Sequence, residues 1–251
     1  MVSFRLSEEQ KMLQDLARDF VNEEVIPNAQ KWDMNGIYPK ETIKKANDYG
    51  LLTVKIPERY GGGGMGSIED VIIAEEIGRG DPGFATAAGS SILASYPIIT
   101  GGTEEQKEKY LSKTADGIIA SYCVTEPDAG SDVRAIKTEA IKDGDEYIIN
   151  GNKMWITGAM HAEWFFVLAY TEKKSGYHGM SGFIIDADSK GIELGKKESN
   201  MGQRCSDTRS VTFNNVIVPE ENLIGGKENE GWMNAMLAFD HSRPAISAHA
   251  V

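Results

Sequence analysis

The residues best suited to chemistry lie where an apolar run meets a polar loop. The run from Gly117 to Val124 has the composition of a buried strand, and it breaks at Glu126-Pro127 into a loop that contains glycine. Such a loop offers free backbone N–H groups, hydroxyls and one flexible glycine to a flat polar ligand. The same residue types also make plain turns, so the loop alone leaves both interpretations open.

Two other segments and one pair of charges could act with this loop. Lys153 to Thr157 (KMWIT) follows an Asn-Gly pair, and Asn200 to Thr208 (NMGQRCSDT) precedes a strand. A tryptophan in such a position is usually a core residue. Asp240 and Arg243 have the spacing of a solvated i, i+3 ion pair, although an arginine also suits phosphate.

Composition excludes several classes of function. The 251 residues carry a net charge of −12, which argues against sequence-independent binding to nucleic acid or anionic membranes. Cys123 and Cys205, the only two cysteines, predict a reducing compartment and are interpreted as packing residues. The four histidines show no metal-ligand spacing, so no metal site is expected.

No targeting or membrane segment is expected from the sequence. The longest apolar runs are too short to span a bilayer, so no integral membrane segment is predicted. Met1 to Leu6 (MVSFRL) resembles neither a signal peptide nor a transit peptide. We expect a cytosolic protein, or a processed or trimmed form of an organellar one.

Helical periodicity covers residues 6 to about 112. Capping boxes at Ser7/Gln10 and Thr103/Gln106 predict two helix starts, and the first helix is expected to end at Pro27. Further helices are expected from Pro39 to Gly50 and from Ser67, which we interpret as a cap.

From Gly117 the pattern changes to short strands separated by turns. Asp143-Gly144 predicts a hairpin, and Asn150-Gly151 is interpreted as the next turn. We expect an antiparallel β-barrel or sandwich, followed by a helix over Gly231–Phe239. The expected strands are 117–124, 138–141, 147–149, 164–170, 182–185, 192–194, 211–213 and 216–218.

This order predicts a multidomain α+β fold. An N-terminal helical domain over 1–116 precedes a middle β-domain over 117–226 and the beginning of a C-terminal helical domain over 227–251. The last segment carries an apolar face with nothing after it to cover that face. We therefore expect a truncated chain or a partial gene product.

Two glycine-rich or small-residue segments have alternative interpretations. The run Gly61 to Gly64 lacks the Lys-Ser/Thr of a phosphate loop, and we interpret it as a connector. The small residues from Ala85 to Ser95 fit either a close helix–helix contact or a thin helix beside an elongated apolar ligand. Close packing is the favoured interpretation.

Taken together, these motifs resemble the acyl-CoA dehydrogenases, flavoenzymes that oxidise fatty acyl-CoA thioesters. Val124 to Asp132 (VTEPDAGSD) is similar to the signature of that family and departs from it in Asp128, where glycine is usual. Trp155-Ile-Thr157 resembles its second flavin segment. The runs from Met201 to Thr208 and from Phe239 to Pro244 look most like medium-chain members.

The resemblance implies a helical domain, a β-domain and a helical bundle, assembled as a homotetramer with FAD between the last two. Trp155 would cover one face of the flavin ring, and Thr157 would donate a hydrogen bond towards flavin N5. It places the flavin against Tyr122, Cys123, Val124, Thr125, Glu126, Pro127, Asp128, Ala129, Gly130, Ser131, Trp155, Ile156 and Thr157. It places the acyl-CoA substrate against Ser131, Asp240 and Arg243.

The implied reaction is α,β-dehydrogenation in fatty acid β-oxidation, with electrons passed to electron-transferring flavoprotein. A carboxylate removes the α-proton as hydride leaves for the flavin. A minority of the family place that base just before the arginine that matches Arg243. Ser242 stands there and cannot serve, so we name no catalytic residue and expect the glutamate beyond Val251.

Two alternatives stay open at this point. One is a non-catalytic short form that binds flavin, CoA or a partner, and the other is an acyl-CoA oxidase. We expect this chain alone to show little turnover and to bind FAD weakly. The compartment implied is the mitochondrial matrix in a eukaryote and the cytoplasm in a bacterium.

Overall fold

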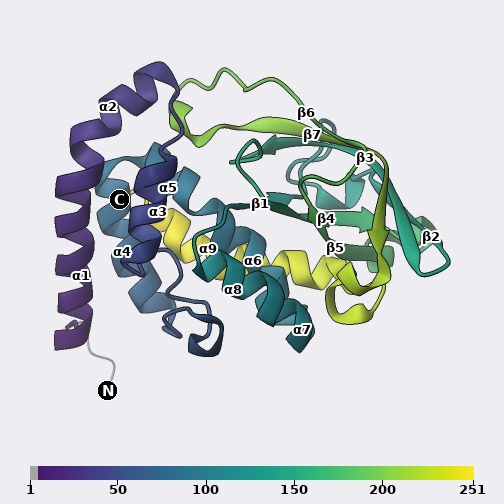
Figure 1. Ribbon diagram of the computed structural model, residues 1–251, viewed down its shortest axis with the longest axis horizontal. Helices are drawn as coiled ribbons and strands as arrows, with labels where there is room; N and C mark the ends of the chain where they lie inside the picture. The colour runs from purple at the N-terminus through teal and green to yellow at the C-terminus, as the bar shows by residue number, and fades with distance from the viewer. Residues whose placement is uncertain (1–4) are drawn as a thin grey trace.

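The computed structural model describes residues 5–251 and consists of a helical part and a curled sheet that lie side by side (Figure 1). Residues 1–4 of the expected first domain lie outside the described residues. The helices are α1 Glu8–Phe20, α2 Ile26–Asn35, α3 Lys40–Asp48, α4 Ser67–Gly80, α5 Pro82–Ala88, α6 Ser90–Gly101, α7 Glu104–Gln106, α8 Ser112–Ala115 and α9 Gly231–Ala248. Both expected capping boxes are present, at Ser7/Gln10 and Thr103/Gln106.

The sheet curls around β4, which pairs with three other strands. β4 runs parallel to β1, antiparallel to β5, and meets the end of β2 in a parallel bridge. The remaining pairings are antiparallel, and the strand order is β1-β4-β2-β3-β7-β6 with β5 against β4. The strands are β1 Ala120–Cys123, β2 Glu139–Asp143, β3 Glu146–Ile156, β4 Trp164–Tyr170, β5 Met180–Asp186, β6 Ile192–Leu194 and β7 Arg209–Pro219.

Two expected strand breaks are bulges inside long strands. The sequence predicts a turn at Asn150-Gly151, but β3 passes through it with a register shift between Ile149 and Gly151. Opposite this point, Asn215 has φ of +50° and β7 continues where two strands were expected. The physical reason is close approach, because a Cβ on Gly151 would lie 2.2 Å from Thr138 Oγ1. Glycine and asparagine serve bulges as well as turns.

The first helix also differs from the expectation. A π-helical turn over Val21–Val25 joins α1 to α2, so the helical path continues past Pro27 to Asn35. Pro27 is the second residue of α2, directly after the π-helical turn, so the proline does not end the helical path. The third predicted cap is shifted by one residue, since Gly66 rather than Ser67 precedes α4.

Helix α9 connects the two parts of the molecule. It begins beside β5 and runs back between α4 and α6 (Figure 1). The Tyr122 hydroxyl, at the end of β1, donates to Ala235 O of α9 at 3.1 Å. No helix within residues 5–251 combines the length and the apolar character needed to cross a bilayer.

A buried carboxylate joins α1 to α4. Glu76 accepts from Arg18 Nη2 of α1 at 2.5 Å and from Arg79 Nε of its own helix at 2.9 Å. Burial by itself would raise the pKa of Glu76, but the hydrogen bonds and charges of Arg18 and Arg79 outweigh it and hold that pKa below its ordinary value. The ionised form of Glu76 is therefore the one that stabilises the fold.

Glu76→Gln should weaken the dependence of the free energy of unfolding on pH in the acidic range. A depressed pKa contributes stability that is present above the ordinary value of 4.5 and lost as pH falls through the folded-state value. We expect the two proteins to differ most at neutral pH and to converge at lower pH, measured by urea unfolding. The exposed neighbour Glu75 provides the control, because Glu75→Gln should follow the wild-type curve. A constant difference between wild type and Glu76→Gln across this range would contradict the assignment.

Candidate functional site

The loop after β1 is a closed turn with an exposed tip. Glu126 and Ala129 exchange two backbone hydrogen bonds, with N···O distances of 3.0 and 3.1 Å. Pro127 and Asp128 lie exposed at the tip, where Asp128 pairs with Lys137 at 2.7 Å. A Cβ added to Gly130 would meet no atom within 4 Å, so the loop backbone is open to a ligand on that side.

A buried ion pair fixes the base of this loop. Lys153 Nζ of β3 has no solvent exposure and lies 2.9 Å from Glu126 Oε1, which is 5% exposed on its side chain. The ammonium also donates to Val124 O and Leu168 O, at 3.2 and 2.8 Å. The Glu126 carboxylate in turn accepts from the backbone and hydroxyl of Thr138. This network ties β1, β3 and β4 to the loop.

The end of β3 presents a tryptophan to solvent. A second register shift, between Lys153 and Ile156, turns Trp155 out of the strand alternation with φ of +63°. Its side chain is 54% exposed. Met154 N donates to Thr125 O at 2.8 Å, so the tryptophan is next to a residue bonded to the loop. A non-glycine residue held in the left-handed region often marks a functional site.

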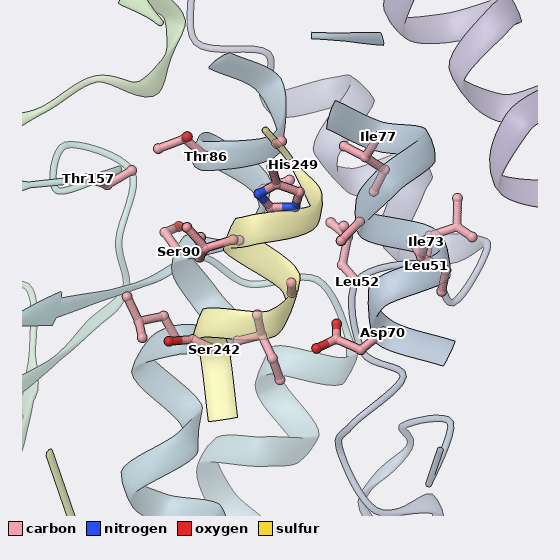
Figure 2. Close-up of a pocket in the computed structure, with 18 of the residues that line it drawn as sticks. Leu51, Leu52, Asp70, Ile73, Ile77, Thr86, Ser90, Thr157, Ser242 and His249 are labelled. Atoms are coloured by element: carbon pink, nitrogen blue, oxygen red, sulfur yellow. The ribbon is translucent and has the colours of Figure 1, made fainter. Parts of the chain in front are cut away.

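Thr157 lies at the edge of a cavity whose other lining residues belong to the helical part and to the α9 segment. Its carbonyl accepts from Ser121 Oγ at 2.7 Å, which anchors the turn to β1. Thr157 lines a cavity of about 140 Å³ together with residues of α4, α5, α6 and α9, among them Ser242 (Figure 2). The walls are largely apolar, so the cavity suits a hydrocarbon group.

The small-residue segment contributes to this cavity and to packing. Ala85, Ala88 and Gly89 line the cavity, whereas Ala87 is buried in the helical core. The segment is two helices, α5 and α6, that meet at Gly89. Close packing, the favoured interpretation, is present in the buried alanines of this segment, and the cavity leaves space beside the same helices.

Several predicted flavin contacts have side chains that point into the core. Four of these side chains are at most 2% exposed, so only their backbone could reach a ligand; they are Cys123, Val124, Ala129 and Ile156. Burial raises the pKa of the Cys123 thiol. The thiol therefore stays protonated and unreactive, as expected of a packing residue. Tyr122 is half-buried and stacks on Phe166 with ring centroids 4.9 Å apart.

The three predicted substrate contacts lie on the surface. Ser131 is exposed and lines a hollow with Tyr177 and Trp232 of α9. Asp240 and Arg243 are both exposed, and no ion pair joins them within the described part of the chain. The Arg243 guanidinium lies over the Phe239 ring, 5.2 Å from its centroid.

Two features of this site were not predicted as functional. One is Lys153, although strand alternation from Tyr147 and Ile149 places it on the buried face, a signal that the sequence does contain. The other is the pair of polar groups that line the cavity, Asp70 and Tyr96. They are distant in sequence, and no motif marks them.

The match to known proteins covers most of the chain. Residues 7–118 match the family model described as acyl-CoA dehydrogenase, N-terminal domain, and residues 121–216 match that of the middle domain. A relative from Caenorhabditis briggsae, named as a probable medium-chain specific acyl-CoA dehydrogenase 2, mitochondrial, is 49% identical over 254 residues. These cover all of this chain and 62% of the relative.

Solved structures agree with the fold. Butyryl-CoA dehydrogenase of Megasphaera elsdenii superimposes with a TM-score of 0.94 at 34% identity, over 99% of this chain and 66% of that one. An acyl-CoA dehydrogenase of Bacillus anthracis complexed with FAD gives 0.91 at 33% identity, over 99% of this chain and 42% of that one.

A helical domain joined to a curled sheet, with a final helix that leads from the sheet back between α4 and α6, defines a known class of protein. The chain belongs to the acyl-CoA dehydrogenase family. It spans 62–66% of the length of curated relatives that it matches. The predicted family and fold class are confirmed.

Proposed function

We propose that this chain forms the flavin-holding part of an FAD-dependent acyl-CoA dehydrogenase. The whole protein would convert a fatty acyl-CoA to its trans-2-enoyl-CoA in fatty acid β-oxidation. The observation that carries the proposal is the exposed Trp155, turned outward beside the loop after β1, with Thr157 two residues on in the wall of an apolar cavity.

The residues present fit an isoalloxazine ring. An indole that is 54% exposed supplies an apolar plate that lacks a partner of similar size within residues 5–251, and a flat ring stacked on it would exclude water. When bound, FAD would accept the hydride that leaves the substrate. The loop from Tyr122 to Ser131 would orient the edge of the flavin ring through its backbone N–H groups and through Thr125. Thr157 would donate a hydrogen bond towards the ring.

The acyl group is assigned to the cavity and the CoA moiety to the surface beside it. Asp240 and Arg243 lie on α9, where an arginine suits phosphate or carbonyl oxygen, and Ser131 lies in the hollow beside the first turn of α9. We assign no catalytic base within this chain. Ser242 lines the cavity, but its hydroxyl donates to Phe239 O at 3.1 Å and a hydroxyl is no match for a carboxylate base.

Several finer assignments belong to the same proposal. The domains are 1–116, 117–226 and the beginning of a third over 227–251. The substrate class is medium-chain acyl-CoA, supported by the name of the C. briggsae relative. The electron acceptor is electron-transferring flavoprotein, and the assembly is a homotetramer. In a eukaryote the protein would work in the mitochondrial matrix, which the same name supports.

The intact protein that contains this chain should lose its flavin absorbance when mixed with acyl-CoA under anaerobic conditions. A series of acyl chain lengths, followed at the flavin band, would give the preferred substrate, and we expect the maximum in the medium-chain range. Reduction of electron-transferring flavoprotein, rather than formation of peroxide, identifies a dehydrogenase. Absence of bleaching with every thioester would overturn the proposal, and peroxide as the main product would indicate an oxidase.

Trp155→Ala should weaken FAD binding about fivefold, because an aromatic stacking contact contributes about 1 kcal/mol. Alanine retains a Cβ, so the strain of the left-handed backbone is similar in both proteins. Equilibrium dialysis with FAD measures the change. Met160, which is 55% exposed, provides the matched control, since Met160→Ala removes an exposed apolar side chain near the same turn. Equal losses in the two variants would argue against a flavin contact at Trp155.

A further inference from the structure

The cavity contains two polar groups in an otherwise apolar wall. Asp70 of α4 and Tyr96 of α6 both line it, and both lie beside Lys55. Lys55 Nζ is 3.7 Å from Asp70 Oδ2 and 5.1 Å from the centroid of the Tyr96 ring. Figure 2 shows the Asp70 carboxylate pointing towards α9, near the level of Ser242.

The side chains of Asp70 and Tyr96 form no hydrogen bond of normal length with any group in residues 5–251. Tyr96 is 2% exposed, and its ring is held by stacking on His241, with centroids 5.5 Å apart. Its hydroxyl forms no hydrogen bond with any group in residues 5–251. The Asp70 side chain is 16% exposed, and Lys55 lies beyond hydrogen-bond distance of it. Asp70 is held only by its ion pair with Lys55, and the Tyr96 hydroxyl has no hydrogen-bond partner in residues 5–251. Polar groups inside proteins are almost always hydrogen-bonded, so the free hydrogen-bonding capacity of these two groups in one cavity indicates a ligand.

The charges in this cluster select the kind of ligand. Lys55 donates to Ser67 Oγ and to His241 O, both at 3.2 Å, and its charge balances that of Asp70. Burial raises the pKa of Asp70, although Lys55 lowers it in part. A carboxylate on the ligand would be repelled by the charge of Asp70, and an ammonium group would be repelled by the charge of Lys55. A neutral hydroxyl meets neither repulsion, since it donates to the carboxylate and accepts from the tyrosine.

We propose that this cavity takes an acyl group that carries a hydroxyl, bound between Asp70 and Tyr96. This inference rests on the proposed function and deepens it by naming the substrate class. Asp70 and Tyr96 act as specificity residues, and the apolar walls bind the rest of the acyl chain. Since a neutral hydrogen bond contributes about 1 kcal/mol net, the hydroxyl should give about a fivefold preference over the unsubstituted chain.

The test compares three kinds of acyl-CoA thioester of equal chain length on the intact, FAD-loaded protein. One is unsubstituted, one set carries a hydroxyl at the last or the next-to-last carbon, and one carries a terminal carboxylate. Binding by calorimetry and kcat/KM for flavin reduction are both measured. We expect one hydroxylated thioester to exceed the unsubstituted one about fivefold and the carboxylated one to be poorest.

Tyr96→Phe should abolish the preference while it retains the ring that stacks on His241. Asp70→Leu serves as the second variant, because Ser67 and His241 O still hold Lys55. Ile73→Val, in the apolar wall, should affect all three kinds of thioester alike. No preference for any hydroxylated thioester, or one that survives Tyr96→Phe, overturns the inference while flavin reduction by the unsubstituted thioester sustains the proposed function. If no thioester reduces the flavin, the proposed function fails, and the calorimetric preference alone decides the inference.

Discussion

Lys153→Met is expected to lower the free energy of unfolding by about 3–5 kcal/mol, the usual cost of removing one partner of a buried ion pair. The change leaves the Glu126 carboxylate buried, without the cation that lies 2.9 Å away. It also leaves Val124 O and Leu168 O without their donor. Urea unfolding followed by circular dichroism measures the loss, and FAD affinity should fall with it because the loop is released.

The pH dependence of this loss gives an independent check. Burial by itself would raise the pKa of Glu126. The charge of Lys153, the hydrogen bond from the Thr138 hydroxyl and the hydrogen bond from the Lys137 backbone N–H together hold that pKa below its ordinary value. Ionised Glu126 thus stabilises the wild type above about pH 4.5, its ordinary value, and this contribution is lost as pH falls. The gap between wild type and Lys153→Met should therefore narrow in acid. A gap that widens there would be inconsistent with a buried carboxylate as the cause.

Lys137→Met is the matched control for this experiment. Lys137 makes an ion pair with Asp128 in which both side chains are mostly exposed, 68% and 73%. Exposed pairs contribute little because solvent screens them. The same chemical change should therefore leave stability nearly unaltered, and an equal loss in both variants would mean that burial of the Lys153 pair is not decisive.

Gly231→Val is expected to destabilise the protein by about 1–3 kcal/mol, the range for overpacking a tight contact. A Cβ at position 231 would lie 2.4 Å from the carbonyl carbon of Ser181 and 2.6 Å from Gly182 N. Both atoms belong to the backbone of β5, so neither can move aside as a side chain would. The first turn of α9 must shift away from the sheet.

Hydrogen exchange along α9 and thermal unfolding report this change. Amides of α9 should exchange faster, and acyl-CoA binding to the intact protein should weaken because α9 carries the proposed acyl-CoA contacts Asp240 and Arg243. Met233, 57% exposed on the same helix, supplies the control for β-branching. If Met233→Val costs as much as Gly231→Val, helix propensity and not the contact with β5 accounts for the loss.

The fold could be predicted where the signals were local. The capping boxes at Ser7 and Thr103 and the hairpin at Asp143-Gly144 depend on residues a few positions apart, and the structure contains all three. Asn150-Gly151 was misleading because its glycine permits close approach to Thr138 rather than chain reversal. A single chain segment does not reveal which neighbour it will approach.

The site was predictable only in part for the same reason. The loop after β1 and the Trp155 segment contain motifs, and the structure joins them through the bond from Met154 N to Thr125 O. The pairing of Lys153 with Glu126 depends on how three strands align. The approach of Asp70 and Tyr96 to one cavity depends on how α4 and α6 pack, which no periodicity specifies.

The position of α9 has a consequence for synthesis on the ribosome. The groove between α4 and α6 stays open until the whole β-domain has emerged, because the helix that lies in it follows the last strand. Until then the nascent helical domain displays apolar surface, such as Ile73 and Ile77, that the finished protein turns towards α9. Such exposure favours aggregation and engagement by chaperones. We expect residues 231–248 to set the moment at which the growing chain becomes resistant to protease.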